Sequence, residues 1–303
     1  MSRIFDALQR SGTEQSGVEY PDLISVVTEV FEREKNSAPQ ALAPVATETE
    51  SPSFESSISE ERLTDGSVSQ PSEFPSLNIS VGPMSRLVFL SAPDSLPAEK
   101  FRFLGVRLRQ FQQSKSLKRV LITSTIPQEG KSLVSANLAG VLALRKQRVL
   151  LIEGDLRRPT LAQQFGLGRL AGLGEWLQGD GRKLTNLYRL DGPDLWLMPA
   201  GDPPANPLEL MQSGKLSRLM EQLSSMFDWI LVDSPPLLPL ADTTVWARLT
   251  EGTLLVAREG KTERAMLQRG LELVKKSELL GVVMNGTNAN HDNYYQSYSP
   301  RPK

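Results

Sequence analysis

The chain has 303 residues, of which 39% are hydrophobic and 23% charged, with a formal net charge of −1. It contains no cysteine, which excludes a disulfide framework and a thiolate metal site, and its one histidine, His291, does not favour a histidine-based metal centre. No apolar run approaches the ~20 residues that span a bilayer, and residues 1–11 do not resemble a secretory signal. We therefore expect a cytoplasmic protein with no membrane span and no nucleic-acid partner.

The first 83 residues are not expected to form a compact domain. Residues 2–10 and 21–34 carry apolar side chains at helical spacing. Residues 36–83 are rich in Ser, Pro, Glu and Thr, and such a segment cannot bury enough apolar surface to offset its chain entropy. We interpret residues 1–83 as short amphipathic helices followed by a largely disordered linker. The helices either dock on a partner or on the next domain, or form only transiently.

From residue 84 to about residue 290, short apolar runs alternate with longer helical patterns. The runs that read as strands are 86–91, 118–124, 147–155, 228–236, 251–259 and 279–286, and the helical patterns are 97–114, 131–146, 207–227 and 263–277. This alternation predicts an α/β fold with a mostly parallel sheet and helices on both faces. Ligands of such sheets bind beyond the carboxyl ends of the strands.

Residues 119–137 contain a pattern typical of phosphate binding. An apolar strand enters a loop that ends in Gly130-Lys131-Ser132 and opens at once into a helical pattern. Backbone N–H groups, the helix dipole and the lysine attract phosphate, and the serine hydroxyl can bind Mg²⁺. The strict pattern G-x-x-x-x-G-K-[ST] is not fully met, because Thr125 stands at its first glycine.

Three acidic residues lie at or near the ends of two of the apolar runs. Glu153 and Asp155 are two residues apart and point to the same face if the strand continues. Asp233 ends another run, just before two prolines. Each acid alone is typical of a solvated strand end. Together with the G-K-S loop they favour a Mg²⁺–nucleotide site, because phosphate-bound Mg²⁺ takes one or two carboxylates.

Five segments in this order resemble the bacterial tyrosine kinases (BY-kinases) of capsule and exopolysaccharide assembly. They are TSTIPQEGKSLVSANLA, VLLIEGDLRRPTLAQQFGL, MPAGDPPANPLELMQSGKL, FDWILVDSPPLLPLADTTV and LGVVMN, and the resemblance covers residues 87–290. It implies a P-loop NTPase-like kinase domain at 84–290 and a flexible tyrosine-containing tail at 291–303. The implied function is an ATP-dependent protein-tyrosine autokinase that regulates polysaccharide synthesis and export.

The resemblance also implies roles for single residues. Glu153 stands where the family has an aspartate proposed to act on the incoming tyrosine hydroxyl, and Asn285 resembles the adenine-edge contact. The implied catalytic residues are Lys131, Glu153, Asp155 and Asp233, and the implied Mg²⁺ ligands are Ser132, Asp155 and Asp233. The implied ATP-binding residues are Thr125, Gln128, Glu129, Gly130, Lys131, Ser132, Leu133 and Asn285, and the implied phosphoacceptors are Tyr294, Tyr295 and Tyr298.

Three departures from the family pattern bear on activity and assembly. The tail carries only Tyr294, Tyr295 and Tyr298, where family members often have more tyrosines. Glutamate at 153 keeps a carboxylate whose reference pKa is only about 0.4 unit higher than that of aspartate, but its extra methylene moves that group by about one bond length. Both attenuation and compensation remain open. The family's E-x-x-R-x-x-R motif, linked to ring-like self-association, here reads Glu99, Arg102 and then Gly105. Self-association is therefore open, and the alternative is a helix-surface ion pair.

An alternative function is an attenuated or non-kinase P-loop ATPase that acts as a nucleotide-dependent switch or scaffold for the export machinery. Positioning ATPases of the Min/Par type carry a second lysine before the loop glycines, and Ile126 at that place argues against that branch. The resemblance further implies a membrane-anchored activator of the polysaccharide chain-length type, here a separate chain. Such a partner would recruit the protein to the inner face of the cell membrane.

Overall fold

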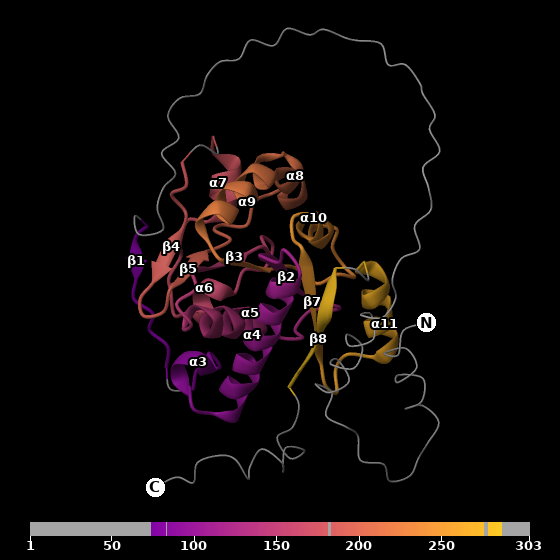
Figure 1. Ribbon diagram of the computed structural model, residues 1–303. Helices are drawn as coiled ribbons and strands as arrows, with labels where there is room; N and C mark the ends of the chain where they lie inside the picture. The colour runs from indigo at the N-terminus through magenta and orange to yellow at the C-terminus, as the bar shows by residue number, and fades with distance from the viewer. Residues whose placement is uncertain (1–73, 83, 181–182, 276–277, 287–303) are drawn as a thin grey trace, which may run out of the picture. The chain divides into compact units, whose positions relative to one another are not determined.

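The computed structural model describes residues 74–82, 84–180, 183–275 and 278–286 (Figure 1). These residues form an eight-stranded sheet with the order β1-β4-β5-β3-β6-β2-β7-β8. Every pair of neighbouring strands is parallel except β4 with β5. The strands are β1 (Ser76–Leu77), β2 (Arg119–Ser124), β3 (Val149–Glu153), β4 (Tyr188–Leu190), β5 (Leu195–Met198), β6 (Trp229–Asp233), β7 (Gly252–Arg258) and β8 (Leu279–Asn285).

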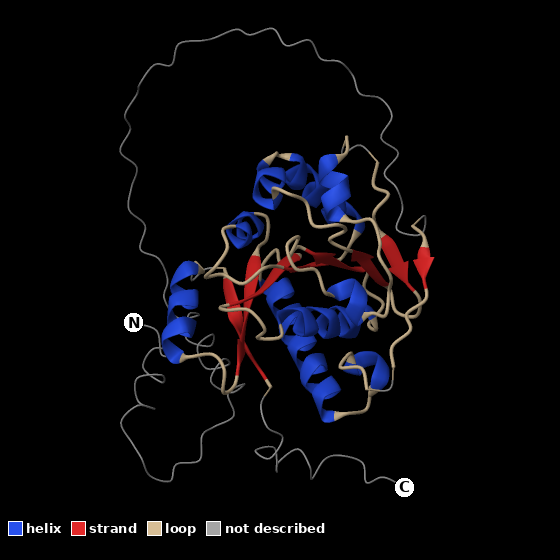
Figure 2. Cartoon of the chain, turned by 180° about the vertical axis from the view of Figure 1, so that it is seen from behind, coloured by secondary structure: helices blue, strands red, loops and turns tan. Residues whose placement is uncertain are grey.

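Helices cover both faces of the sheet (Figure 2). One buried cluster joins the sheet to α3, α4, α5 and α6, and a second joins its other face to α7, α8, α9 and α10. The helices are α3 (Val88–Ser91), α4 (Leu96–Ser114), α5 (Lys131–Ala143), α6 (Leu161–Gln164), α7 (Leu173–Gln178), α8 (Pro207–Gln212), α9 (Lys215–Met226), α10 (Asp242–Arg248) and α11 (Arg264–Leu273). The predicted mostly parallel α/β architecture is confirmed.

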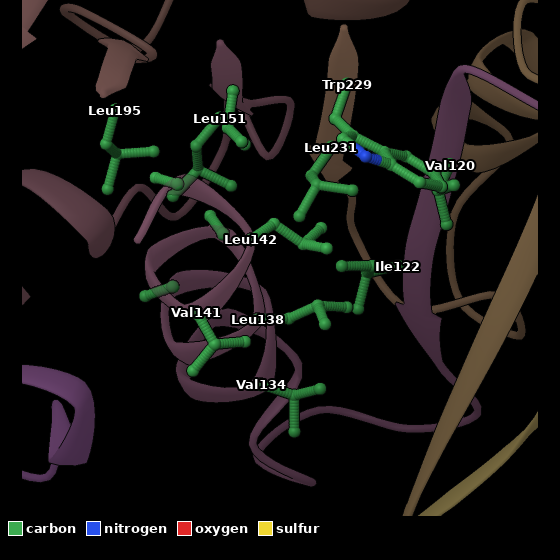
Figure 3. Close-up of a cluster of buried hydrophobic side chains, with 14 of the residues drawn as sticks. Val120, Ile122, Val134, Leu138, Val141, Leu142, Leu151, Leu195, Trp229 and Leu231 are labelled. Atoms are coloured by element: carbon green, nitrogen blue, oxygen red, sulfur yellow. The ribbon is translucent and has the colours of Figure 1, made fainter. Parts of the chain in front are cut away.

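Helix α5 lies at the centre of the first cluster and fixes the position of the phosphate-binding pattern. Every residue from Val134 to Ala143 is buried. Figure 3 shows Leu138 and Leu142 directed toward Ile122 of β2 and Leu231 of β6. Burial of each such side chain contributes roughly 1.5–3 kcal/mol. The helix is therefore anchored along its length, and its first residue is held beside the carboxyl ends of the central strands.

The segment expected as a strand at 86–91 is instead helical. Residues Val88–Ser91 form α3, and the buried Phe89 packs on α5, where a Cβ at Gly140 would lie 2.4 Å from its ring. The side chain of Asn137 accepts the Phe89 N–H at 3.4 Å and donates to the Arg86 carbonyl at 3.0 Å. A short apolar run does not distinguish a strand from a buried helix, and here these tertiary contacts decide.

The linker expected to extend to residue 83 contains the edge strand of the sheet. Residues Ser76–Leu77 pair in parallel with β4, and the neighbouring Phe74 is buried.

The sequence patterns also did not predict strands β4 and β5, although β5 is buried along its whole length. The single helical pattern expected at 207–227 is two helices, because the chain breaks at Gly214, where φ is 75°. Helices expected at 2–10 and 21–34 lie outside the described residues.

On α4, the partial E-x-x-R motif forms a local contact. Glu99 and Arg102 make an ion pair one helical turn apart, and Arg102 also donates to the Pro93 carbonyl at 2.7 Å. Gly105, at the motif's next position, is buried against Leu142 of α5. The helix-surface ion pair is present, and such pairs contribute a few tenths of a kcal/mol.

None of the helices in the described ranges is both long enough and apolar enough to cross a membrane.

Candidate active site

The carboxyl ends of three adjacent central strands bring the predicted site together. Strand β2 lies between β6 and β7, and β6 lies between β2 and β3. In the ladder register, Asp233 is opposite Ile122 of β2 on one side and Glu153 of β3 on the other. The phosphate-binding loop begins at the carboxyl end of β2, beside these residues, and ends at the first turn of α5.

Lys131 lies between two buried carboxylates. Its Nζ is 3.2 Å from an Asp155 oxygen and 3.9 Å from an Asp233 oxygen, and it donates to the Ser132 hydroxyl at 3.3 Å. The lysine side chain is 13% exposed and that of Asp233 1%. Ser135, one turn along α5, donates to the other Asp233 oxygen at 3.2 Å. The structure thus gathers one ammonium group, two carboxylates and a hydroxyl at a helix N-terminus.

Burial and charge act in opposite directions on these groups. Burial lowers the pKa of Lys131, but the nearby Asp233 and Asp155 carboxylates outweigh it and leave the pKa above its usual value. The ammonium group is therefore protonated throughout the neutral range. Burial raises the pKa of Asp233, and Lys131 partly opposes that rise. The positive charge of Lys131 therefore stabilises the ionised form of the Asp233 carboxyl group.

The loop before α5 needs glycine at 130 for two reasons. Its φ is 94°, in the left-handed region, where a side chain is disfavoured. A Cβ there would also lie 2.0 Å from the side-chain nitrogen of Asn285, which donates to the Glu129 carbonyl at 2.8 Å. Asn285, expected at the adenine edge, thus contacts the loop backbone directly. Gly130 permits both the turn and this close approach.

The remaining predicted loop residues have distinct surroundings. Thr125 is buried, and its hydroxyl lacks a hydrogen-bond partner among the residues that the structure describes; a Cβ at Gly270 of α11 would lie 2.9 Å from it. Gln128 is exposed, Glu129 is completely buried, and Leu133 packs half-buried against the first core cluster. Thr125 therefore fills space beneath α11, where the strict motif would place a glycine.

Glu153 is held by backbone amides rather than by Lys131. One carboxylate oxygen accepts the N–H groups of Thr160 and, at 2.5 Å, of Leu161, and the other accepts the Ala200 N–H at 3.1 Å. The residue is 1% exposed. Burial raises the pKa of Glu153, against the opposing effect of these three amides. The carboxylate thereby joins the start of α6 to the segment that follows β5.

Glu153 also lines a cavity of about 370 Å³. Its walls come from the segments after β3 and β5, and include Pro159, Gly168 and Gly201. Arg169 and Asp202, which also line it, form a two-bond ion pair with one contact at 2.6 Å. A substrate group that entered this cavity would approach the Glu153 carboxylate.

The segment after β3 is fixed by α10, which sequence reasoning missed. Arg157 makes two hydrogen bonds to the buried Asp242, at 2.7 and 3.2 Å. The Trp246 indole donates to the Gly154 carbonyl at 3.1 Å, and a Cβ at Gly154 would lie 2.7 Å from that ring. These contacts orient the strand end that carries Asp155. In the sequence, only the glycine between the two acids of E-G-D indicates that the Trp246 ring approaches the backbone so closely here.

Among the described residues, no three Asp, Glu, His or Cys side chains gather closely enough to hold a metal by themselves. The available oxygens are those of Ser132, Asp155 and Asp233, which are hard donors of the kind Mg²⁺ prefers. Mg²⁺ in nucleotide sites commonly uses one or two carboxylates and takes its other ligands from phosphates and water. The donor set fits that arrangement.

Comparison with known proteins identifies the family. The tyrosine-protein kinase YwqD of Bacillus subtilis (strain 168) is 32% identical over 217 residues, which cover 71% of this chain and 92% of that protein. The chain belongs to the bacterial tyrosine kinase family. The kinase domain of the Escherichia coli tyrosine kinase ETK has a TM-score of 0.61 and 28% identity, and the match covers 66% of this chain and 80% of that one.

Two further relatives are longer than this chain. The tyrosine-protein kinase ptk of Acinetobacter johnsonii is 34% identical over 193 residues, 64% of this chain but 26% of that protein. The succinoglycan biosynthesis transport protein ExoP of Rhizobium meliloti (strain 1021) is 32% identical over 225 residues, 73% of this chain and 28% of that protein. The chain thus spans about a quarter of these two relatives. No family model matches the sequence.

Proposed function

We propose that the chain is an ATP- and Mg²⁺-dependent protein-tyrosine kinase that phosphorylates the tyrosines of its own C-terminal tail, at 291–303. The observation that carries this proposal is the position of Lys131, between Asp155 and Asp233 and at the N-terminus of α5. Family membership supports the assignment to tyrosine. The proposed kinase domain is 84–290, preceded by the N-terminal region 1–83.

The roles of the site residues follow from what phosphoryl transfer requires. ATP supplies the phosphoryl group, and its Mg²⁺ ion supplies positive charge that neutralises the negative charge of the phosphates. Lys131 and the backbone N–H groups at the start of α5 would bind the phosphate oxygens. Ser132, Asp155 and Asp233 would hold the metal. Asn285, which contacts the loop backbone, would lie next to the adenine.

Glu153 is proposed to orient or deprotonate the acceptor tyrosine. Its carboxylate lines the cavity beside Thr160 and Gly201, where a phenol ring could approach it. The three amide hydrogen bonds fix the carboxylate where the longer side chain of glutamate places it. Geometry matters here, because misplacement of about 1 Å can lower a rate by ~10²-fold.

We further propose that the kinase regulates capsule or exopolysaccharide synthesis and export together with a separate membrane-anchored activator. Relatedness to a succinoglycan biosynthesis transport protein supports the polysaccharide role. The activator would recruit the kinase from the cytoplasm to the inner face of the membrane. On α4, the motif linked to self-association retains Glu99 and Arg102 but has Gly105 at its next position.

The tail tyrosines test the proposed reaction. Tyr294, Tyr295 and Tyr298 lie outside the described residues, so their role rests on the sequence. Replacing all three by phenylalanine is expected to remove most of the phosphotyrosine formed with Mg-ATP, because each variant ring lacks the acceptor hydroxyl. ATP binding should persist. Mass spectrometry of the incubated protein and ATP titration measure the two quantities, with Tyr188→Phe, in β4, as the matched control.

Persistent phosphotyrosine in the triple variant would contradict the tail assignment. Hydrolysis of ATP by the unaltered protein without any phosphotyrosine would contradict the kinase proposal itself. That result would favour the second candidate, a nucleotide-dependent switch or scaffold for the export machinery. One observation favours this alternative. Both Glu153 oxygens already accept hydrogen bonds from backbone amides, so the carboxylate is less available to a tyrosine hydroxyl.

A further inference from the structure

The phosphate-binding loop has a backbone conformation that its own sequence does not favour. Gln128 has a φ of 66° and Gly130 a φ of 94°, so left-handed residues flank Glu129 on both sides. Glycine adopts this region readily, whereas glutamine does not. Contacts from outside the loop must therefore help to hold residues 128–130.

The strongest of these contacts reaches Glu129 from the segment between β7 and α11. Glu129 is 0% exposed. One of its carboxylate oxygens accepts the Ile126 N–H at 2.9 Å, within the same loop, and the other accepts the hydroxyl of Thr262. The Thr262 oxygen in turn accepts the Arg258 N–H at 2.7 Å. The hydroxyl therefore has a fixed donor direction, and hydrogen bonds to a carboxylate are stronger than those between neutral groups.

Two further contacts join the same two segments. The guanidinium of Arg258 donates to the Gln128 carbonyl at 3.3 Å, and Lys261 donates to the Gln128 side chain at 3.0 Å. Both are exposed and therefore weakly restraining. Asn285, from β8, donates to the Glu129 carbonyl at 2.8 Å, whereas Thr262 donates from outside the loop to the buried Glu129 carboxylate, a charged acceptor. Because hydrogen bonds to a charged group are the stronger ones, we expect the Thr262–Glu129 hydrogen bond to restrain the loop most.

We propose that Thr262 is a positioning residue for nucleotide binding, which acts through the Glu129 carboxylate to hold the loop with its N–H groups directed at the phosphates. This inference rests on the proposed ATP site. Donors that are already in place bind phosphate without paying an ordering cost on binding. Thr262 contacts Glu129 and not the reacting atoms, so its loss should weaken nucleotide binding and leave the chemical step unchanged.

The test compares Thr262→Val, which keeps the shape but removes the hydroxyl, with Thr262→Ser, which restores it. In Thr262→Val the Kd for Mg-ATP and the KM for ATP should rise about five- to tenfold, the effect of one lost hydrogen bond, with kcat within about twofold. Thr262→Ser should bind as the unaltered protein does. Thr250→Val is the matched control. It also removes a threonine hydroxyl, but that hydroxyl donates to the Trp246 carbonyl, before the start of β7, and not to the phosphate-binding loop.

Equal ATP affinity in Thr262→Val and the unaltered protein would contradict the inference, as would failure of Thr262→Ser to restore binding. A loss of kcat with unchanged KM would also contradict it. If Thr262→Val does not fold, Thr262→Ala is judged by the same criteria. Absence of ATP binding in the unaltered protein would instead overturn the proposed function, and the inference with it.

Discussion

Replacement of Lys131 by methionine is expected to lower autophosphorylation by about 10³-fold, to background. Methionine keeps an unbranched side chain but removes the charge that faces Asp155 at 3.2 Å and Asp233 at 3.9 Å. Loss of one preorganised electrostatic contact to a transferring group typically lowers a rate by about 10²- to 10³-fold. Here the variant also loses phosphate binding, which adds to the effect. Phosphotyrosine formation over time with Mg-ATP measures it.

The same substitution should destabilise the protein by roughly 3–5 kcal/mol at neutral pH, because it leaves buried carboxylates without their cation. The effect has a defined pH dependence. Burial already raises the pKa of Asp233, and removal of Lys131 raises it further. The folded variant then holds a proton that the unfolded chain releases, so its stability falls as the pH rises through the raised pKa and recovers on acidification.

Thermal unfolding of the Lys131→Met variant between pH 5 and pH 8 checks this sign, with Lys115→Met as the control. Lys115 is an exposed lysine at the end of α4, and its replacement should change neither activity nor the pH profile. A Lys131→Met variant that retained autophosphorylation, or that was least stable at the acid end, would contradict the role given to this lysine.

Replacement of Glu153 by aspartate is expected to increase autophosphorylation by about tenfold or more. Aspartate withdraws the carboxylate by one methylene, toward the position that the family pattern uses. A shift on the order of 1 Å at a reacting group can change a rate by ~10²-fold. The shorter side chain cannot reach all three amides that Glu153 engages, so stability should fall by about 1–3 kcal/mol as buried N–H groups lose their acceptor.

Glu153→Gln provides the matched comparison. It has the length of glutamate, but one of its two oxygens becomes an NH₂ donor that faces backbone N–H groups. We expect a similar loss of stability and no gain in activity. A gain with aspartate alone indicates an attenuated kinase. Unchanged, low phosphotyrosine in both variants, together with normal ATP binding, would contradict attenuation and favour the switch or scaffold.

Much of the site could be predicted because its elements are local in sequence. The loop and helix around Lys131 form one continuous pattern. Asp155 follows β3 and Asp233 is the last residue of β6, so the parallel sheet brings both to the carboxyl ends of its central strands. The partners of these residues could not be predicted in the same way. Ala200 binds Glu153, Asp242 binds Arg157, and neither contact has a local signature.

Burial explains the remaining differences between prediction and structure. Residues Val88–Ser91 are helical because Phe89 packs over Gly140, a contact that joins positions about fifty residues apart. The two residues of β1 are too few to show a period, and their pairing with β4 is visible only in the fold. Thr262 stands in a polar segment whose sequence gives no sign that its hydroxyl meets the buried Glu129.

The most direct test of the proposed site is a crystal structure of the protein with Mg²⁺ and a non-hydrolysable ATP analogue. We expect the triphosphate to lie along residues 129–132 and Lys131 Nζ to contact its terminal phosphates. Ser132 and at least one of Asp155 and Asp233 should lie in the metal's coordination sphere, directly or through water. A nucleotide bound elsewhere, or a bound triphosphate that leaves Lys131 and both aspartates out of reach, would contradict the proposal.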